Sequence, residues 1–131
     1  MAKPFFDTNV LLYLFSADLT KAEQARAVVR DGGVISVQVL NEFAAVARRK
    51  LDMSWSDIRL AVERLASLCD VHPLTLETHC EAVRLAERHG WHIYDALIVS
   101  SAKLADAEIL YSEDLQAGQR VGRRLQIRNP F

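Results

Sequence analysis

The stretch Lys3-Pro4-Phe5-Phe6-Asp7, near the start of the 131-residue chain, is the first of several short apolar segments from which we predict the fold. We interpret residues 3–6 as a short, mainly apolar strand that ends at Asp7. A helical pattern follows over residues 10–15, and this alternation of strand and helix continues along the chain. Further strands are predicted over residues 34–36, 71–74, 109–112 and 125–127.

Helices are predicted between these strands from the spacing of apolar residues and from capping residues. Thr20 and Glu23 form a capping-box signature for a helix that ends at Gly32-Gly33. The remaining helices are predicted over residues 37–50, from Ser54 or Ser56, from Thr75 or Thr78 to Gly90, and over residues 94–104.

The order of these elements predicts the fold class. Short strands separated by helices favour parallel pairing through right-handed crossovers. The strands are mostly apolar rather than alternating, which is typical of a sheet covered on both faces. We therefore expect an α/β protein, a three-layer α/β/α sandwich with a parallel sheet of four to five strands. No linker or repeat divides residues 1–131, which indicates a single domain.

Composition excludes several classes of protein. Lys and Arg number 16 and Asp and Glu 17, and the net charge of −1 excludes a histone-like protein that binds nucleic acid by bulk charge. The longest uncharged stretches, residues 8–17 and 32–41, are about half of the roughly 20 residues that a membrane span needs. The N-terminal residues also lack the apolar region of a signal peptide. We therefore expect a cytoplasmic protein with no membrane contact.

The cysteines and histidines do not indicate a metal site. Cys69 and Cys80 are too few for a disulfide framework. Together with His72 and His79 they match zinc spacing poorly, because two of the four would be adjacent in sequence.

Two carboxylates follow predicted strands. Asp7 ends the first strand and Asp114 comes just after the fourth. In α/β sheets, ligands bind beyond the carboxyl ends of the strands, so both positions are candidate site positions. The alternatives are that Asp7 only caps a helix and that Asp114 is only a turn residue.

Two further carboxylates lie on apolar helix faces. Glu42 shares a face with Val39 and Val46, and Asp95 shares one with Ile98, which lies three residues further on. A carboxylate on such a face is costly unless it is paired or bound to a metal. The alternatives are that Glu42 lies at the edge of the stripe and that Asp95 stabilises the positive end of its helix.

Convergence of these acids would require a cation. Four carboxylates at one sheet edge repel each other unless some are protonated or a multivalent cation neutralises them. A site of oxygen ligands suits Mg²⁺ or Mn²⁺, and such an ion binds phosphate oxygens and activates water. The pattern therefore indicates phosphodiester hydrolysis.

Four short motifs, in this order along nearly the whole chain, resemble those of the PIN-domain nucleases. They are Asp7-Thr8-Asn9, Glu42 within Val39-Leu40-Asn41-Glu42-Phe43, Tyr94-Asp95-Ala96-Leu97-Ile98, and Ser112-Glu113-Asp114. The chain is most similar to the VapC-type ribonuclease toxins of bacterial toxin–antitoxin pairs.

The resemblance implies a sheet of order 3-2-1-4-5 with an acidic pocket at its carboxyl edge. It also implies a metal-dependent endoribonuclease that holds one or two Mg²⁺ or Mn²⁺ ions, acts on RNA, binds a small antitoxin protein and forms a homodimer. The implied catalytic and metal-binding residues are Asp7, Glu42, Asp95 and Asp114. The implied supporting residues are Thr8, Asn9 and Ser112.

Two basic groups are candidates for contact with RNA phosphates. Arg48, Arg49 and Lys50 end one predicted helix, and Arg123 and Arg124 lie in a stretch with no acid after Asp114. The alternatives are favourable charge at a helix C-terminus for the first group and a solvated surface for the second.

Other functions are weighed against this hypothesis. A haloacid-dehalogenase phosphatase needs a second aspartate where this chain has Asn9, and dinucleotide binding needs a glycine-rich turn that is absent from the sequence. The remaining alternative is a catalytically weak PIN-like module whose acidic pocket serves mainly to bind a protein partner.

Overall fold

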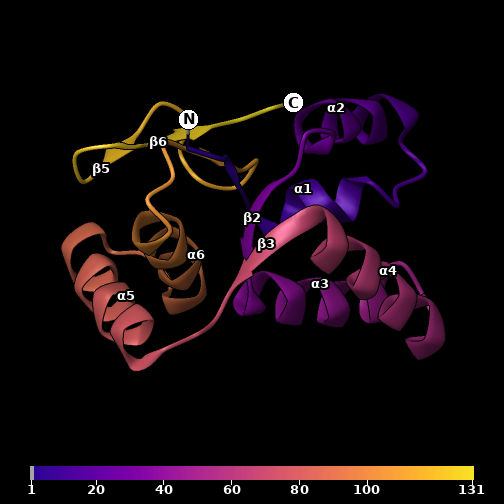
Figure 1. Ribbon diagram of the computed structural model, residues 1–131, viewed down its shortest axis with the longest axis horizontal. Coiled ribbons are helices and arrows are strands. Elements are labelled where there is room, and N and C mark those ends of the chain that lie inside the picture. Colours follow the sequence, from indigo (N-terminus) through magenta and orange to yellow (C-terminus); the bar gives the residue numbers. More distant parts are fainter. Residues whose placement is uncertain (1) are drawn as a thin grey trace.

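A six-stranded sheet runs through the computed structural model, which describes residues 2–131 (Figure 1). The strand order is β3-β2-β1-β4-β6-β5, and all neighbours pair in parallel except β5 and β6, which form an antiparallel hairpin. The strands are β1 (Phe5–Phe6), β2 (Gly33–Ser36), β3 (Cys69–His72), β4 (Ile109–Tyr111), β5 (Arg120–Val121) and β6 (Leu125–Arg128).

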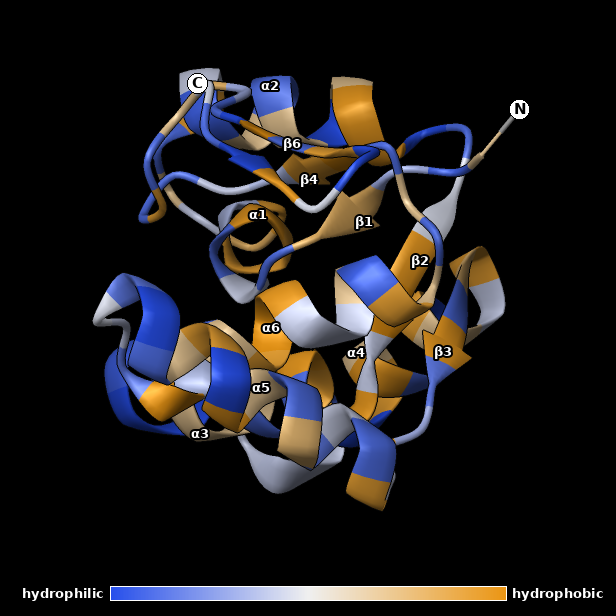
Figure 2. Ribbon diagram, turned by 90° about the vertical axis from the view of Figure 1, so that its left-hand side faces the viewer, coloured by the Kyte–Doolittle hydropathy of each residue, from blue (hydrophilic) through white to orange (hydrophobic). Residues whose placement is uncertain are grey.

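Each of the three parallel crossovers between β1 and β4 contains two helices. They are α1 (Thr8–Tyr13) and α2 (Leu19–Val29), α3 (Val37–Lys50) and α4 (Trp55–Leu68), and α5 (Leu76–His89) and α6 (Ile93–Leu104). Figure 2 shows α2 on one side of the sheet and α3, α5 and α6 on the other. The predicted α/β/α layering is therefore confirmed.

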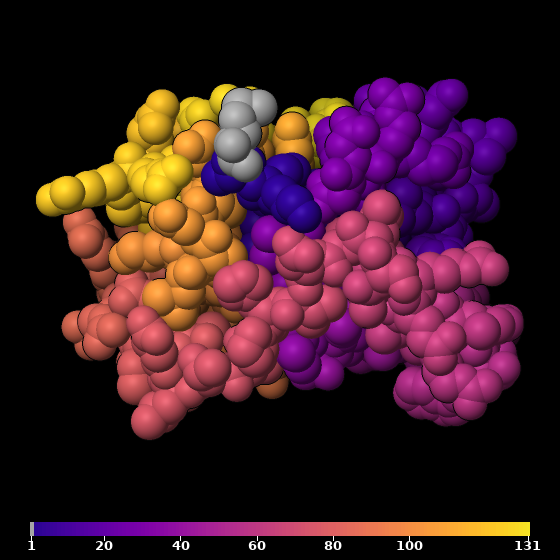
Figure 3. All heavy atoms as spheres, viewed as in Figure 1, coloured from indigo at the N-terminus to yellow at the C-terminus, as the bar shows by residue number. Residues whose placement is uncertain are grey.

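The central strand β1 carries the core of the protein. Phe5 and Phe6 are completely buried, as are Val39 and Phe43 of α3. Each such side chain contributes about 1.5–3 kcal/mol through removal of apolar surface from water. In the space-filling view, the indigo atoms of the first described residues lie between the yellow-orange C-terminal part and the purple segment around α2 (Figure 3).

Gly33 allows β2 to approach β1 closely. A Cβ atom at this position would lie 2.5 Å from a ring carbon of Phe6 and 2.6 Å from the Pro4 carbonyl oxygen. Both distances are too short for any side chain, so only glycine permits the buried Phe6 ring to pack here.

The structure corrects several local predictions. The first helix is α1 over Thr8–Tyr13, which begins two residues before the predicted stretch 10–15 because Asp7 is its N-cap. The N-cap of α2 is Asp18, which accepts a hydrogen bond from the Lys21 N–H, and not Thr20. β3 begins at Cys69, two residues before the predicted start, because α4 passes directly into the strand. The five predicted strands have the implied order 3-2-1-4-5, and the two-residue β5 was missed because Arg120-Val121 has no apolar run of its own.

Helix length bears on membrane insertion. Within residues 2–131, each helix is too short or too polar to span a bilayer.

Candidate active site

The four predicted carboxylates line one pocket of about 560 Å³ at the carboxyl edge of the sheet. Asp7 enters it from the end of β1, Glu42 from α3, Asp95 from α6 and Asp114 from the turn after β4. The other polar residues that line the pocket are Thr8, Asn9, Arg49, Lys50, Tyr94 and Glu113, together with Tyr13. Parallel strands bring these segments together because their carboxyl ends meet at one edge.

Asp7 is the most buried of the four acids. It is the N-cap of α1, and its Oδ1 accepts a hydrogen bond from the Thr8 backbone N–H at 2.7 Å. Its Oδ2 accepts a hydrogen bond from the Ser112 hydroxyl at 2.8 Å. The residue is only 6% exposed. Asp7 both caps α1 and lines the pocket, so the two interpretations of Asp7 do not exclude each other.

The electrostatics of Asp7 favour a nearby cation. Burial raises the pKa of Asp7 to about 7, although the hydrogen bonds from Ser112 and Thr8 favour the charged form. The neighbouring carboxylates of Glu42 and Asp114 contribute to the same rise. A cation in the pocket would lower the pKa of Asp7 again, because it favours the charged form of the carboxylate.

Glu42 is half-buried on α3 and is held by a neighbour of Asp7. The Thr8 hydroxyl donates a 3.0 Å hydrogen bond to Glu42 Oε2. Burial raises the pKa of Glu42, hydrogen bonds from Thr8 and Gln38 lower it, and the Asp95 carboxylate raises it. Thr8 therefore links the first and second acids of the pocket.

Asn9 links the first and fourth acids. Its Nδ2 donates to Asp114 Oδ2 at 3.1 Å and makes a longer contact of 3.4 Å with Asp7 Oδ2. The Ser112 hydroxyl also accepts hydrogen bonds from the backbone N–H groups of Asp114 and Leu115, both at 3.2 Å. The three residues predicted as supporting, Thr8, Asn9 and Ser112, thus contact the predicted acids directly.

Asp95 lies half-buried in the first turn of α6. Burial raises the pKa of Asp95, His92 lowers it, and Asp114 raises it. The effect of Asp114 on both Asp7 and Asp95 indicates that the four carboxylates share one electrostatic environment.

The donor set fits Mg²⁺ or Mn²⁺ in chemistry, because the pocket offers carboxylate, hydroxyl and amide oxygens. Within residues 2–131, however, no three His, Cys, Asp or Glu side chains lie close enough together to hold one ion as they stand. The acids line a common pocket, and they would have to come closer together to share one ion.

The basic candidates divide between the pocket and other surfaces. Arg49 and Lys50 line the pocket, whereas Arg48 donates to the Met53 carbonyl at 3.1 Å and lies over the Trp55 ring. Arg124 is held in ion pairs with Asp106 at 2.8 Å and Glu108 at 3.0 Å. Arg123 is exposed, and neither Arg123 nor Arg124 lines the pocket.

Sequence reasoning missed three polar residues of the pocket lining. Tyr94 and Glu113 stand directly before Asp95 and Asp114 in the quoted motifs, but nothing in their spacing showed that they reach the pocket. Tyr13 is the last residue of α1, and its position on the pocket wall follows only from the tertiary structure.

The fold and the acidic pocket define a parallel α/β domain with an oxygen-rich site at the sheet edge. A model of the PIN domain family matches residues 5–121, and the chain belongs to this family. A comparison with curated proteins finds no match.

Several solved structures share this fold. A chain of a toxin–antitoxin complex from Klebsiella pneumoniae has a TM-score of 0.75 and 19% identity, and 98% of each chain is covered. VapC20 of Mycobacterium tuberculosis, a sarcin–ricin loop cleaving toxin, has a TM-score of 0.71 and 19% identity over 85% of this chain and 89% of that one. A chain of DNA-bound VapBC from Salmonella typhimurium has a TM-score of 0.72 and 17% identity over 100% of both chains.

Proposed function

We propose that this protein is a metal-dependent endoribonuclease and the toxin of a toxin–antitoxin pair. The single observation that supports this function best is the pocket in which Asp7, Glu42, Asp95 and Asp114 come together beside Arg49 and Lys50. Carboxylates can hold a cation and basic side chains can bind phosphates, so a pocket that contains both suits the hydrolysis of a phosphodiester.

Asp7, Glu42, Asp95 and Asp114 would hold one or two Mg²⁺ or Mn²⁺ ions. When bound, the ion supplies activated water and neutralises the charge that develops on the phosphate oxygens. Ser112 and the Thr8 backbone fix the Asp7 carboxylate, while Asn9 fixes Asp114, so these side chains orient the acids before RNA binds.

Arg49 and Lys50 would bind the RNA backbone. Both lie at the basic C-terminal end of α3, and within residues 2–131 neither has an ion-pair partner. Their charges are therefore available to phosphates. This local pair is compatible with the near-zero net charge, because it needs no excess of basic residues elsewhere.

The partners belong to the same proposal. Solved structures with this fold include VapBC complexes and other toxin–antitoxin complexes, which supports a small antitoxin as the partner of this chain. We further propose a homodimer and a cytoplasmic location, where the RNA substrate would be met.

RNA cleavage by the purified protein tests the proposal. We expect cleavage with Mg²⁺ or Mn²⁺, none with EDTA, and a loss of at least about 100-fold in Asp7→Asn and Asp95→Asn. Asp31→Asn, which removes an exposed carboxylate outside the pocket, should leave the rate unchanged. Equal cleavage by the wild type and both pocket variants would contradict the proposal.

A binding module is the second candidate. The absence of a ready-made ion cluster within residues 2–131 favours it, because an acidic pocket of this kind could also hold the basic segment of a partner protein. Tight binding of a basic peptide in the pocket, with no metal-dependent cleavage of any RNA, would support this function instead.

A further inference from the structure

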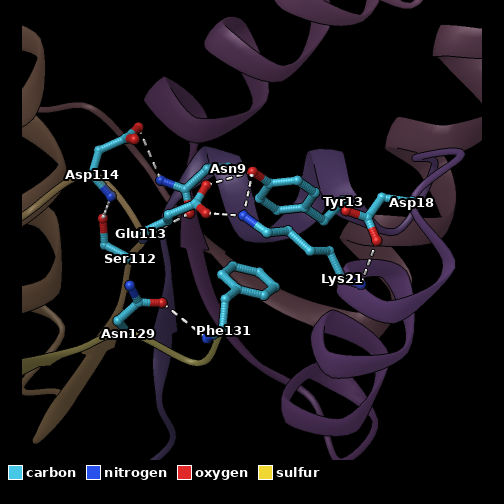
Figure 4. A network of polar contacts seen from close by, with 9 residues as sticks. All are labelled: Asn9, Tyr13, Asp18, Lys21, Ser112, Glu113, Asp114, Asn129 and Phe131. Carbon is cyan, nitrogen blue, oxygen red and sulfur yellow. Dashed lines mark hydrogen bonds and ion pairs between the residues drawn. The ribbon is translucent and has the colours of Figure 1, made fainter.

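A second polar cluster, which we call the Lys21 cluster, borders the pocket through Tyr13 and Glu113, which line it. It consists of Lys21 of α2, Tyr13 of α1 and Glu113 of the turn after β4 (Figure 4). The Tyr13 hydroxyl donates to Glu113 Oε2 at 2.5 Å, and the Lys21 ammonium forms an ion pair with Glu113 Oε1. Lys21 Nζ also lies 3.1 Å from the Tyr13 hydroxyl oxygen.

Phe131 covers the Lys21 cluster. Its ring meets the Tyr13 ring edge-on, with 4.7 Å between the centroids, and Lys21 Nζ lies 5.4 Å from the centre of the Phe131 ring. The side chains of Lys21 and Glu113 are only 31% and 25% exposed. The ion pair is therefore partly withdrawn from water, where its attraction is screened less than at an open surface.

The cluster is linked to the pocket through Asn9. The Glu113 backbone N–H donates to Asn9 Oδ1 at 3.1 Å, and Asn9 Nδ2 donates to Asp114 Oδ2 at 3.1 Å. Figure 4 shows that the Glu113 carboxylate points toward Tyr13 and Lys21, whereas the Asp114 carboxylate points toward Asn9. Two acids that are adjacent in sequence thus have different partners.

We propose that the Lys21 cluster is a positioning device, in which Lys21 and Tyr13 tie Glu113 to the pocket wall and thereby hold Asp114 in place as the fourth pocket carboxylate. This inference rests on the proposed function, because it gives Asp114 a role in binding the metal ion. Lys21, Tyr13 and Glu113 act through Asp114 and are positioning residues.

Asp114 needs such a device. It is exposed, and its side chain is held by a single hydrogen bond from Asn9. The turn that carries it is held through the two residues before it: Glu113 pairs with Lys21, and the Ser112 hydroxyl accepts a hydrogen bond from the Asp114 backbone N–H. Glu113 itself is held from two sides, by the Tyr13 hydroxyl and by the Lys21 ammonium.

Positioning and charge alone predict opposite effects for Lys21→Met. If Lys21 acts only through its charge, removing a cation from beside the pocket should tighten the binding of Mn²⁺. If the cluster positions Asp114, the same substitution should weaken Mn²⁺ binding by about tenfold, a loss typical of outer-shell support in metal sites. The direction of the change in Kd distinguishes the two roles.

The experiment compares Lys21→Met, Lys21→Arg and Glu113→Gln with Lys103→Met. The last variant breaks a similar ion pair, Lys103–Glu81, that lies outside the pocket. The Kd for Mn²⁺ is measured by electron paramagnetic resonance, and amide hydrogen exchange at Glu113 and Asp114 is measured by NMR without metal.

For Lys21→Met we expect about tenfold weaker Mn²⁺ binding and about tenfold faster exchange at both amides. Lys21→Arg and Glu113→Gln, which can keep hydrogen bonds within the cluster, should lie within about threefold of the wild type, as should Lys103→Met. Unchanged exchange at Glu113 and Asp114, or tighter Mn²⁺ binding in Lys21→Met, would overturn the inference.

A wild-type protein that binds no Mn²⁺ would contradict the proposed metal dependence instead. In that case the exchange rates would still decide whether the Lys21 cluster holds the turn. A strong loss of Mn²⁺ affinity in Glu113→Gln would show that Glu113 is itself a ligand, and would also overturn the inference. If Lys21→Met does not fold, Tyr13→Phe removes one tie to Glu113 and should raise both amide exchange rates.

Discussion

The Ser112 hydroxyl donates a 2.8 Å hydrogen bond to the Asp7 carboxylate across 105 positions of sequence. This contact joins the ends of the adjacent parallel strands β1 and β4. Ser112 is completely buried, and its oxygen also accepts hydrogen bonds from the backbone N–H groups of Asp114 and Leu115. One side chain therefore fixes both the most buried acid of the pocket and the turn that carries another.

Removal of the Ser112 hydroxyl should affect both stability and activity. Ser112→Ala leaves Asp7 without one hydrogen bond and leaves two backbone N–H groups without an acceptor. We expect a loss of about 1–3 kcal/mol in the free energy of unfolding, and a 10- to 100-fold loss of cleavage. Urea unfolding and an RNA cleavage assay measure the two effects.

Ser101→Ala is the matched control for Ser112→Ala. Ser101 is 2% exposed, and its hydroxyl has no hydrogen-bond partner within residues 2–131. Its removal should leave the stability unchanged or slightly higher, because no hydrogen bond is lost. A similar destabilisation in both variants would mean that the contacts of the Ser112 hydroxyl contribute nothing specific.

The stability of the metal-free protein should depend on the ionisation of Asp7. The pKa of Asp7 is raised from 3.8 to about 7, so the folded state binds a proton more tightly than the unfolded state. This stabilisation is complete below about pH 4 and is lost as the pH rises through about 7. In EDTA at pH 8, Asp7→Asn should therefore be more stable than the wild type by about 2–4 kcal/mol.

Urea unfolding between pH 4 and pH 8 checks this prediction. The difference between the wild type and Asp7→Asn should shrink as the pH falls toward 4. Asp31→Asn, an exposed control, should show no such trend. A metal-free wild type that is as stable as Asp7→Asn at pH 8 would mean that Asp7 is not destabilised by burial.

Divalent cations should stabilise the wild type selectively. An ion that binds only the folded state adds about 2.7 kcal/mol when its concentration is 100 times the Kd. We expect Mn²⁺ to raise the Tm of the wild type and to leave the Tm of Asp7→Asn nearly unchanged, because Asp7 is the acid that burial destabilises most. Differential scanning calorimetry with Mn²⁺ and with EDTA measures the shift, and an equal shift in both proteins would exclude Asp7 as a ligand.

The pocket arginine and lysine should matter more for RNA binding than the distal arginines. Arg49→Glu with Lys50→Glu should weaken binding and reduce the slope of log K against log salt by about 0.7 for each lost phosphate contact. Arg123→Glu with Arg124→Glu, which sequence reasoning predicted to weaken RNA binding, serves as the comparison. Because Arg124 already pairs with Asp106 and Glu108, we expect the larger loss in the pocket variant.

Fluorescence anisotropy with a labelled single-stranded RNA, at several salt concentrations, measures both pairs. A larger loss in Arg123→Glu with Arg124→Glu would move the RNA-binding surface away from the pocket. Equal slopes in all three proteins would mean that neither pair contacts phosphates.

Much of the fold could be predicted because it depends on local patterns. Helix α3 begins and ends where the spacing of apolar residues predicts, at Val37 and Lys50, with Ser36 as its N-cap. The same spacing singled out Glu42 and Asp95, because a carboxylate on an apolar face stands out against its neighbours. Strand ends then indicated Asp7 and Asp114, since parallel strands bring their carboxyl ends to one edge.

The remaining features depend on distances between segments that are remote in sequence. The start of α2 was mispredicted because Asp18 and Thr20 are both good caps, and a pattern of residue types does not decide between them. The pattern of residues along the sequence does not show that Lys21 pairs with Glu113, or that Arg124 forms ion pairs with Asp106 and Glu108.

The residue pattern alone was enough for the α/β class, for most of the helices and strands, and for the four candidate acids, whereas the strand order came from the resemblance to the PIN-domain nucleases. The type of each element and its buried face follow from the spacing of apolar residues, which is a local property of the chain. Which basic side chains line the pocket, and which are already in ion pairs, depends on how segments remote in sequence pack together. A long, flexible charged side chain has many acids within reach, and its partner is fixed by packing rather than by its neighbours in sequence.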